Sequence, residues 1–166
     1  MVGGAAIQPV VAAQAAPTGS PAPPLTVRGD CDAKGETPVI RVQIANKSDR
    51  PTGVVLGFNP NPQTHVVNSI HVIAIRPATG ASDDYLYVNP KFALAKGTPW
   101  IVSLAPGATH DLELPLRDFI STFTYNPLDP SIVSGTRLVV DGRAASKSST
   151  PVWTGKIETV LDVCRV

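Results

Sequence analysis

The sequence predicts an all-β protein in which about seven or eight antiparallel strands form a sandwich. Three observations predict this class. Short apolar segments alternate with polar residues at a period of two, as strands with one buried face require. The 166 residues include 17 Pro and 13 Gly but only 16% charged residues, a composition that disfavours long surface helices. Turn-forming residues separate the apolar segments at short intervals.

The clearest strand signal runs from Pro38 to Phe58. Apolar residues occupy every second position in residues 40–44, and Asn46 to Pro51 then supplies residues that prefer turns. A second apolar run follows in residues 53–58. This pattern predicts either a hairpin or a crossing between two packed sheets.

The first 24 residues differ in composition from the rest of the chain. They carry no charged side chain, and Ala13-Gln14-Ala15 resembles the small-residue pattern that ends a secretory signal. No Lys or Arg precedes the apolar part, so a low-complexity tail is the alternative. We expect residues 1–24 to be a tail or signal remnant and residues 25–166 to be one domain, which is long enough to bury a core.

The first strand is expected over Leu25–Cys31, and it contains the triplet Arg28-Gly29-Asp30. This triplet matches an integrin adhesion tripeptide, but adhesion requires a protruding loop rather than a strand. Residues 69–76 are apolar at both phases, which predicts a central strand or one whose outer side is covered. The covering element could be a partner, the tail or a long loop.

Tyr85 and Tyr87 share one face of a short strand over residues 85–88. They can form either the edge of the core or a surface platform with polar tips. The preceding turn carries Asp83-Asp84, which could bind calcium with Asn89 or simply be solvated.

A hairpin is expected over residues 100–116, because Pro106-Gly107 has the residue preference of a type II turn. Residues 117–124 are ambiguous between one helical turn and an irregular crossover. Residues 136–143 and 152–166 should form the closing strands. Proline-rich loops are expected at Asn59–Pro62 and Asn126–Pro130.

The two cysteines, Cys31 and Cys164, lie near the two ends of the expected domain. A disulfide between them would close a very long loop and stabilise the fold by about 4–5 kcal/mol. Such a bond suits an exported protein. Two buried free thiols in a cytosolic protein are the alternative.

Two segments resemble those of many bacterial exported immunoglobulin-like domains. In the first, a strand is followed by Asn46-Lys47-Ser48, then Pro51 and a second strand, and the other is the turn Leu104-Ala105-Pro106-Gly107. The resemblance is generic and implies an immunoglobulin-like sandwich. Residues 44–58 are also similar to a strand pair of periplasmic pilus chaperones, which have two domains, whereas only one fits here. Neither their function nor their anchor residues are therefore carried over. Asn46-Lys47-Ser48 is also a glycosylation acceptor pattern, although a role in capping the turn is favoured.

The sequence carries no pattern that predicts catalysis. No Gly-x-Ser-x-Gly elbow or phosphate-binding loop is present, so no catalytic residue and no cofactor are predicted. His65, His71 and His110 are weak candidates for metal ligands, because nothing in their spacing makes them converge. With 14 basic and 13 acidic residues dispersed along the chain, nucleic-acid binding is not expected. The sequence contains no run of eighteen apolar residues, so no membrane-spanning helix is predicted.

We therefore expect a non-catalytic, exported β-sandwich that binds a protein partner, as an accessory or structural subunit of a cell-envelope or secreted complex. The candidate interaction surface consists of Tyr85, Tyr87, Trp100, Ile73 and Ile75. A periplasmic module that binds copper or carbohydrate is the alternative, and an inhibitor or pilus-type subunit is a further one. The sequence leaves the oligomeric state open.

Overall fold

The computed structural model describes residues 24–33, 35–58, 67–76, 79–88, 99–133, 135–142, 152–162 and 164. The expectations for most of the tail, for the loop Asn59–Pro62, for His65 and for Asn89 lie outside the described residues.

Antiparallel strands dominate these residues and no α-helix occurs in them. The strands are β1 (Leu25–Asp32), β2 (Val39–Asn46), β3 (Thr52–Phe58), β4 (Val67–Asn68), β5 (Ile70–Ile75), β6 (Ser82–Tyr87), β7 (Pro99–Leu104), β8 (Thr109–Pro115), β9 (Phe119–Ser121), β10 (Arg137–Asp141) and β11 (Lys156–Val160). Two 3₁₀ turns, η1 (Leu116–Asp118) and η2 (Pro130–Ile132), interrupt the second half. The predicted all-β antiparallel sandwich is confirmed, with several strands shorter than expected.

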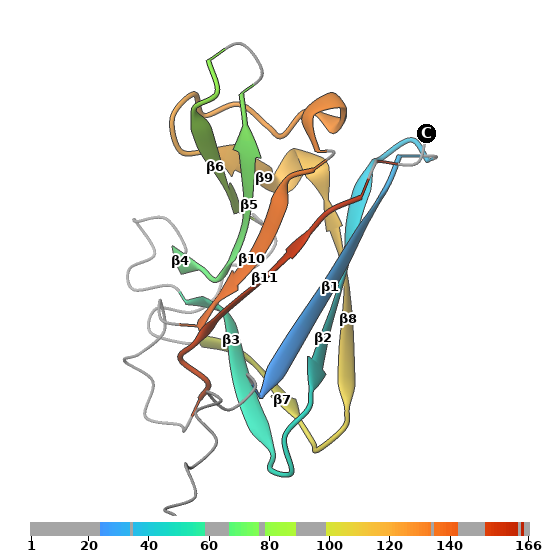
Figure 1. The fold of residues 1–166 in the computed structure, drawn as a ribbon, viewed down its shortest axis with the longest axis vertical. Helices are drawn as coiled ribbons and strands as arrows, with labels where there is room; N and C mark the ends of the chain where they lie inside the picture. Colours follow the sequence, from blue (N-terminus) through green and yellow to red (C-terminus); the bar gives the residue numbers. More distant parts are fainter. Residues whose placement is uncertain are drawn as a thin grey trace, which may run out of the picture.

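The strands form three sheets (Figure 1). One sheet has the order β1-β2-β8, and a five-stranded sheet has the order β11-β10-β5-β6-β9. A third, smaller sheet has the order β4-β3-β7. The doubly apolar strand β5 lies in the middle of the five-stranded sheet, as its sequence predicts.

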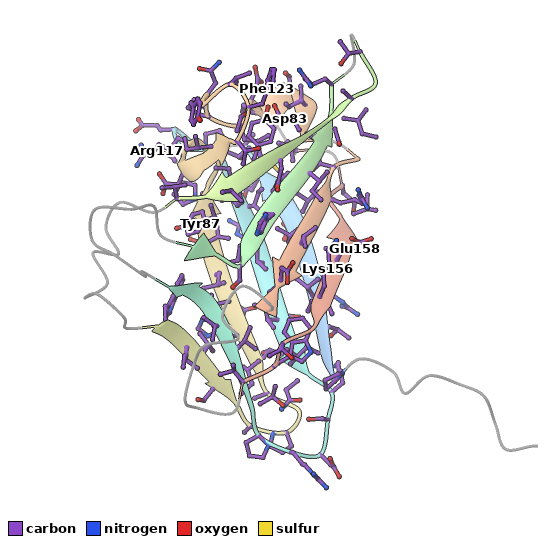
Figure 2. The ribbon with its side chains drawn as sticks, turned by 90° about the vertical axis from the view of Figure 1, so that its left-hand side faces the viewer. Asp83, Tyr87, Arg117, Phe123, Lys156 and Glu158 are labelled. Carbon is purple, nitrogen blue, oxygen red and sulfur yellow. A yellow bond between two sulfur atoms is a disulfide. The ribbon has the colours of Figure 1, made fainter. Side chains whose placement is uncertain are left out.

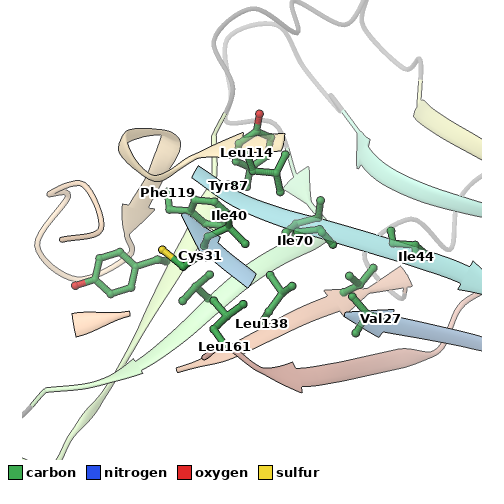
Figure 3. Packing of buried hydrophobic residues seen from close by; sticks show 14 of the residues in the cluster. Val27, Cys31, Ile40, Ile44, Ile70, Tyr87, Leu114, Phe119, Leu138 and Leu161 are labelled. Atoms are coloured by element: carbon green, nitrogen blue, oxygen red, sulfur yellow. The ribbon is translucent and has the colours of Figure 1, made fainter. Parts of the chain in front are cut away.

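One hydrophobic core joins the sheets (Figure 3). Alternate residues of β1 and β2 point into it, and the intervening residues, such as Arg28 and Arg41, face solvent. The largest fully buried side chains include Phe119, Leu25, Ile40, Ile44, Leu56, Ile70, Leu114, Leu116, Leu138 and Leu161. Burial of these apolar side chains is the main favourable contribution to folding.

The segment Pro38–Phe58 is a crossing between sheets and not a hairpin. β2 pairs with β1 and β8, whereas β3 pairs with β4 and β7. Asn46 is fully buried at the crossing. Its side-chain amide donates hydrogen bonds to the carbonyl oxygens of Arg50, Leu104 and Ala105 at 2.8, 3.0 and 3.2 Å.

The expected hairpin over residues 100–116 is wrong, although its turn is formed as predicted. The N–H of Ala108 donates to the carbonyl oxygen of Ala105 at 3.0 Å, and Gly107 has a φ of 72°. However, β7 pairs with β3 and β8 pairs with β2. The turn therefore also crosses between sheets. It joins the other crossing, because the N–H of Gly107 donates to the carbonyl oxygen of Asn46 at 3.0 Å.

A disulfide joins Cys31 of β1 to Cys164 beyond β11, which confirms the pairing expected from the sequence. It links two sheets whose edge strands lie side by side without pairing by hydrogen bonds (Figure 1). Gly29 faces inward at this seam, and a Cβ there would lie 2.7 Å from methyl groups of Leu138 and Leu161. The triplet that begins at Arg28 is therefore part of a strand and does not form a protruding loop.

Candidate functional site: an aromatic turn at one end of the sandwich

Only part of the candidate interaction surface predicted from the sequence is exposed to solvent. Tyr85 and Tyr87 are buried, with exposed fractions of 7% and 2%, so the core-edge alternative is the one observed. Their side of β6 faces the core, and Tyr87 packs there against the Phe119 ring, with ring centroids 5.2 Å apart. Trp100 is partly buried and packs against the core. Of the other two residues, which lie on the outer face of the five-stranded sheet, Ile75 is exposed and Ile73 is half-buried.

The described histidines do not converge on a metal site. His71 lies on the outer face of the five-stranded sheet, where its Nδ1 is 3.3 Å from the carboxyl oxygens of Asp84. His110 lies opposite Ile44 on the inner face of the β1-β2-β8 sheet. Among the described residues, no group of three or more His, Cys, Asp or Glu side chains could hold a metal ion. The acidic pair lies in β6 and not in a turn, and its first member, Asp83, is buried.

One end of the five-stranded sheet gathers the exposed large hydrophobic side chains of the described residues. Tyr125 is 76% exposed, Phe123 68%, Ile75 65% and Val160 60%. β5 and β11 both run toward this end, where Ile75 and Val160 are their last residues (Figure 1). Phe123 lies at the same end (Figure 2). The sequence placed only one of these four residues, Ile75, in its candidate surface.

Phe123 and Tyr125 are carried by a tight turn over residues 122–125, which we name the aromatic turn. The N–H of Ser121 donates to the carbonyl oxygen of Asn126 at 2.9 Å, and the N–H of Tyr125 donates back to the carbonyl oxygen of Ser121 at 3.0 Å. A β-bridge between Ile120 and Pro127 continues this pairing. The turn is thus closed like a hairpin at the edge of the five-stranded sheet.

The aromatic turn is fixed from inside by the side chain of Ser121, which is 1% exposed. Its hydroxyl accepts hydrogen bonds from the N–H groups of Phe123 and Thr124 at 3.1 and 2.9 Å. The same hydroxyl donates to the carboxyl group of Asp83, both oxygens of which lie 3.0 Å away. Asp83 is itself only 4% exposed. It lies at the same end of the molecule as Phe123 (Figure 2). A buried carboxyl group therefore holds the serine that orders the turn.

Arg76 packs behind the aromatic turn. Its guanidinium carbon lies 4.9 Å from the centroid of the Phe123 ring, a cation–π contact. Its Nε is buried and has no hydrogen-bond partner among the described residues. The contact supports one face of the Phe123 ring, while most of the side chain stays exposed.

Tyr85 lies beside the buried carboxyl group of Asp83, and its pKa depends on that group. Burial raises the pKa of the Tyr85 phenol, and the negative charge of Asp83 and a hydrogen bond with it raise the pKa further. The folded protein therefore disfavours the ionised phenol. The stability contributed by neutral Tyr85 is present below the unfolded pKa of about 10 and is lost as the pH rises through the folded pKa.

We expect Tyr85→Phe to remove this alkaline sensitivity. Unfolding by urea, measured from pH 8 to pH 11.5, should show wild-type stability falling more steeply above pH 10 than that of the variant. At pH 8 the variant should be the less stable protein, because it lacks the bond to Asp83. Parallel pH profiles of the two proteins would contradict this assignment.

The β1-β2-β8 sheet carries a different outer face. A shallow groove of about 440 Å³ crosses the middle of this sheet and is bordered by Arg28, Asp30 and Glu113. Within it Arg41 forms ion pairs with Asp32 and Glu113 at 2.9 and 3.2 Å. This face is charged and internally paired, in contrast to the end that carries the aromatic turn.

Sequence reasoning missed the aromatic turn because the segment 117–124 has no clear period. Residues 116–118 form the 3₁₀ turn η1, residues 119–121 form β9, and the aromatic turn follows. A usable signal was present in Ser121-Thr122-Phe123-Thr124-Tyr125, where two aromatic residues two apart stand in an otherwise polar segment. Serine at its start is a residue that bonds to nearby backbone N–H groups.

Two further results bear on function. No helix among the described residues is long and apolar enough to cross a membrane. Comparisons with protein-family models, with curated proteins and with solved structures found no match.

Proposed function

We propose that this protein is a non-catalytic, exported β-sandwich that binds another protein, as an accessory or structural subunit of a cell-envelope or secreted complex. The observation that carries the proposal is the exposure of Ile75, Phe123, Tyr125 and Val160 at the end of the five-stranded sheet where β5, β9 and β11 end. Several large apolar side chains exposed at one end of a folded domain are typical of a protein interaction site.

The distribution of charge on the remaining surface supports the choice of this end. On the outer face of the five-stranded sheet, Glu158 pairs with Arg137 at 3.6 Å and with Lys156 at 3.7 Å (Figure 2). These ion pairs are partly solvent-exposed, and Arg137 lies between Ile73 and Val160 in the strand register. Protein interfaces commonly combine aromatic and aliphatic side chains at the centre with a polar rim.

Export is supported by the covalent link between Cys31 and Cys164. Disulfides of this structural kind form and persist in oxidising compartments and are rare in the cytosol.

The proposal is tested with the purified wild-type protein and a variant of the apolar end, Ile75→Ser with Val160→Ser. Both side chains are more than half exposed, so we expect the variant to fold. Wild-type protein should retain a partner from a native envelope or secreted fraction, as seen by pull-down and by size-exclusion chromatography with light scattering. The variant should retain less of it.

The matched control is Thr26→Ser with Gln43→Ser, which changes the same number of residues on the outer face of the β1-β2-β8 sheet. It should bind as the wild type does. A wild-type protein that remains a monomer and retains no partner would refute the proposed function.

A further inference from the structure

We propose that Phe123 and Tyr125 form the anchor of this interaction and insert into an apolar pocket of the partner, whose rim carries Lys or Arg side chains that meet Asp129. This inference rests on the proposed function and adds to it the contact element and the chemistry of the partner's surface. Four features of the aromatic turn carry it.

The first feature is the backbone of Tyr125. Its φ is 60°, and it is the only non-glycine residue of the described chain in the left-handed region. Gly and Asn occupy such turn positions readily, whereas a bulky side chain there is a rare outlier that costs about 1–2 kcal/mol. Folding alone favours Gly or Asn at position 125. A tyrosine at this position therefore indicates a role for its side chain outside folding.

The second feature is exposure. Tyr125 and Phe123 leave 76% and 68% of their surfaces in water, the highest fractions among the exposed large hydrophobic residues of the described chain. Rings exposed to this extent contribute little burial to the stability of the domain. The same two rings would bury a large area in a complex, where Tyr and Trp are common hot-spot residues.

The third feature is the rigidity of the support. Ser121 orders the turn through two backbone N–H groups and is itself held by Asp83. Arg76 supports the Phe123 ring from behind. A turn whose backbone is already ordered loses less conformational entropy on binding, and this raises affinity. A turn that projects beyond the edge of a sheet is convex, so the surface that fits it is concave.

The fourth feature is charge. Asp129 is exposed and follows residues 126–128, which return alongside β9 from the aromatic turn. Its hydrogen bonds from Ser131 hold the pKa of its carboxyl group below the usual range, so the group is ionised at neutral pH. Residues 119–133 contain no Lys or Arg, while the charged Arg76 lies against the Phe123 ring and the exposed Arg117 precedes β9. A partner whose rim is basic on the side of Asp129 is therefore complementary to this carboxylate.

The contact is located by photo-crosslinking in the whole protein. p-Benzoylphenylalanine replaces Phe123 in one protein and Thr109, an exposed residue next to the turn between β7 and β8, in the control. Illumination in the cells that make the protein should give a discrete protein adduct from position 123 and much less from position 109. Equal adducts at both positions, no adduct at position 123, or adducts with lipid would overturn the inference.

Affinity then tests the role of the ring. The partner identified by crosslinking is purified. The Kd of its complex is then measured with the wild-type protein and with the variants Tyr125→Gly and Tyr125→Asn. Both substitutions suit the left-handed backbone, so the Tm should stay the same or rise. We expect the Kd to rise at least about tenfold, as for a hot-spot aromatic residue. Wild-type affinity in both variants would overturn the anchor but leave the proposed function intact.

Asp129→Asn tests the basic rim. Asparagine can still accept the hydrogen bond from the N–H of Ser131, which is 2.8 Å long in the wild type. The variant should associate more slowly, and its association rate should depend less on salt concentration than that of the wild type. The same salt dependence in both proteins would overturn the assignment of a basic rim.

Discussion

Replacing both Cys31 and Cys164 by alanine should lower the free energy of unfolding by about 4–5 kcal/mol. The two cysteines are 133 residues apart, so their bond closes a loop that contains nearly the whole domain. Without it the unfolded chain gains the entropy of that open loop. This loss is a large part of the total stability of a domain of this size.

The destabilisation caused by losing the disulfide should be greatest in particular strands. The bond closes the seam between β1 and β11, which are neighbours but not partners in a sheet. We expect amide hydrogen exchange to accelerate first in these two strands, and the urea midpoint to fall, in the double variant and in reduced wild-type protein alike. A double variant within about 1 kcal/mol of the wild type would contradict this account of the seam.

Substitution of Asn46 by aspartate should be about as severe, with a loss of about 3–5 kcal/mol at neutral pH. The side-chain amide of Asn46 is fully buried and donates to the carbonyl oxygens of Leu104 and Ala105, besides that of Arg50. A carboxylate of the same shape would face these oxygens without a hydrogen to donate. Both crossings between the sheets would lose the side-chain contact that they share, and only the backbone bonds of residue 46 would still join them.

The pH dependence and a matched control separate this mechanism from a general loss of packing. Protonation gives the introduced carboxyl group a hydrogen to donate, so the deficit relative to the wild type should shrink as the pH falls from 7 to 4. Ser48→Ala removes the hydroxyl that donates to the Oδ1 atom of Asn46 at 2.7 Å and lies 2.9 Å from the carbonyl oxygen of Arg50, but it keeps the 3.0 Å bond from the backbone N–H of residue 48 to Oδ1. It should lose about 1 kcal/mol. Urea titrations at both pH values measure all three proteins, and a pH-independent deficit would contradict the mechanism.

The buried amide of Asn46 also decides between the two interpretations of Asn46-Lys47-Ser48. The nitrogen that a glycan would modify is enclosed and already donates to three backbone oxygens. Ser48 donates to the Oδ1 atom of the same side chain through its N–H and its hydroxyl. The motif therefore serves the turn, as favoured from the sequence.

Strand positions and inward faces followed from the sequence because they depend on local alternation. Ile40, Val42 and Ile44 are buried, and Arg41 and Gln43 between them are exposed, as their period of two requires. The apolar character of both faces of β5 correctly indicated a central strand. Turn chemistry was equally local, since the turn at Pro106-Gly107 formed with the predicted geometry.

Strand pairing and the candidate site were decided by the tertiary structure. The same Pro-Gly turn can join two strands of one sheet or two strands of different sheets. The long-range pairing of β8 with β2 and of β7 with β3 selects the second case. Tyr85 and Tyr87 were ambiguous because alternation says which residues share a face but not what covers that face. The aromatic turn depends on Asp83, which is 38 residues from Ser121 in the sequence and is brought to it only by the pairing of β6 with β9. Local periodicity thus determined the strands, and contacts between distant segments determined the surface on which function is proposed.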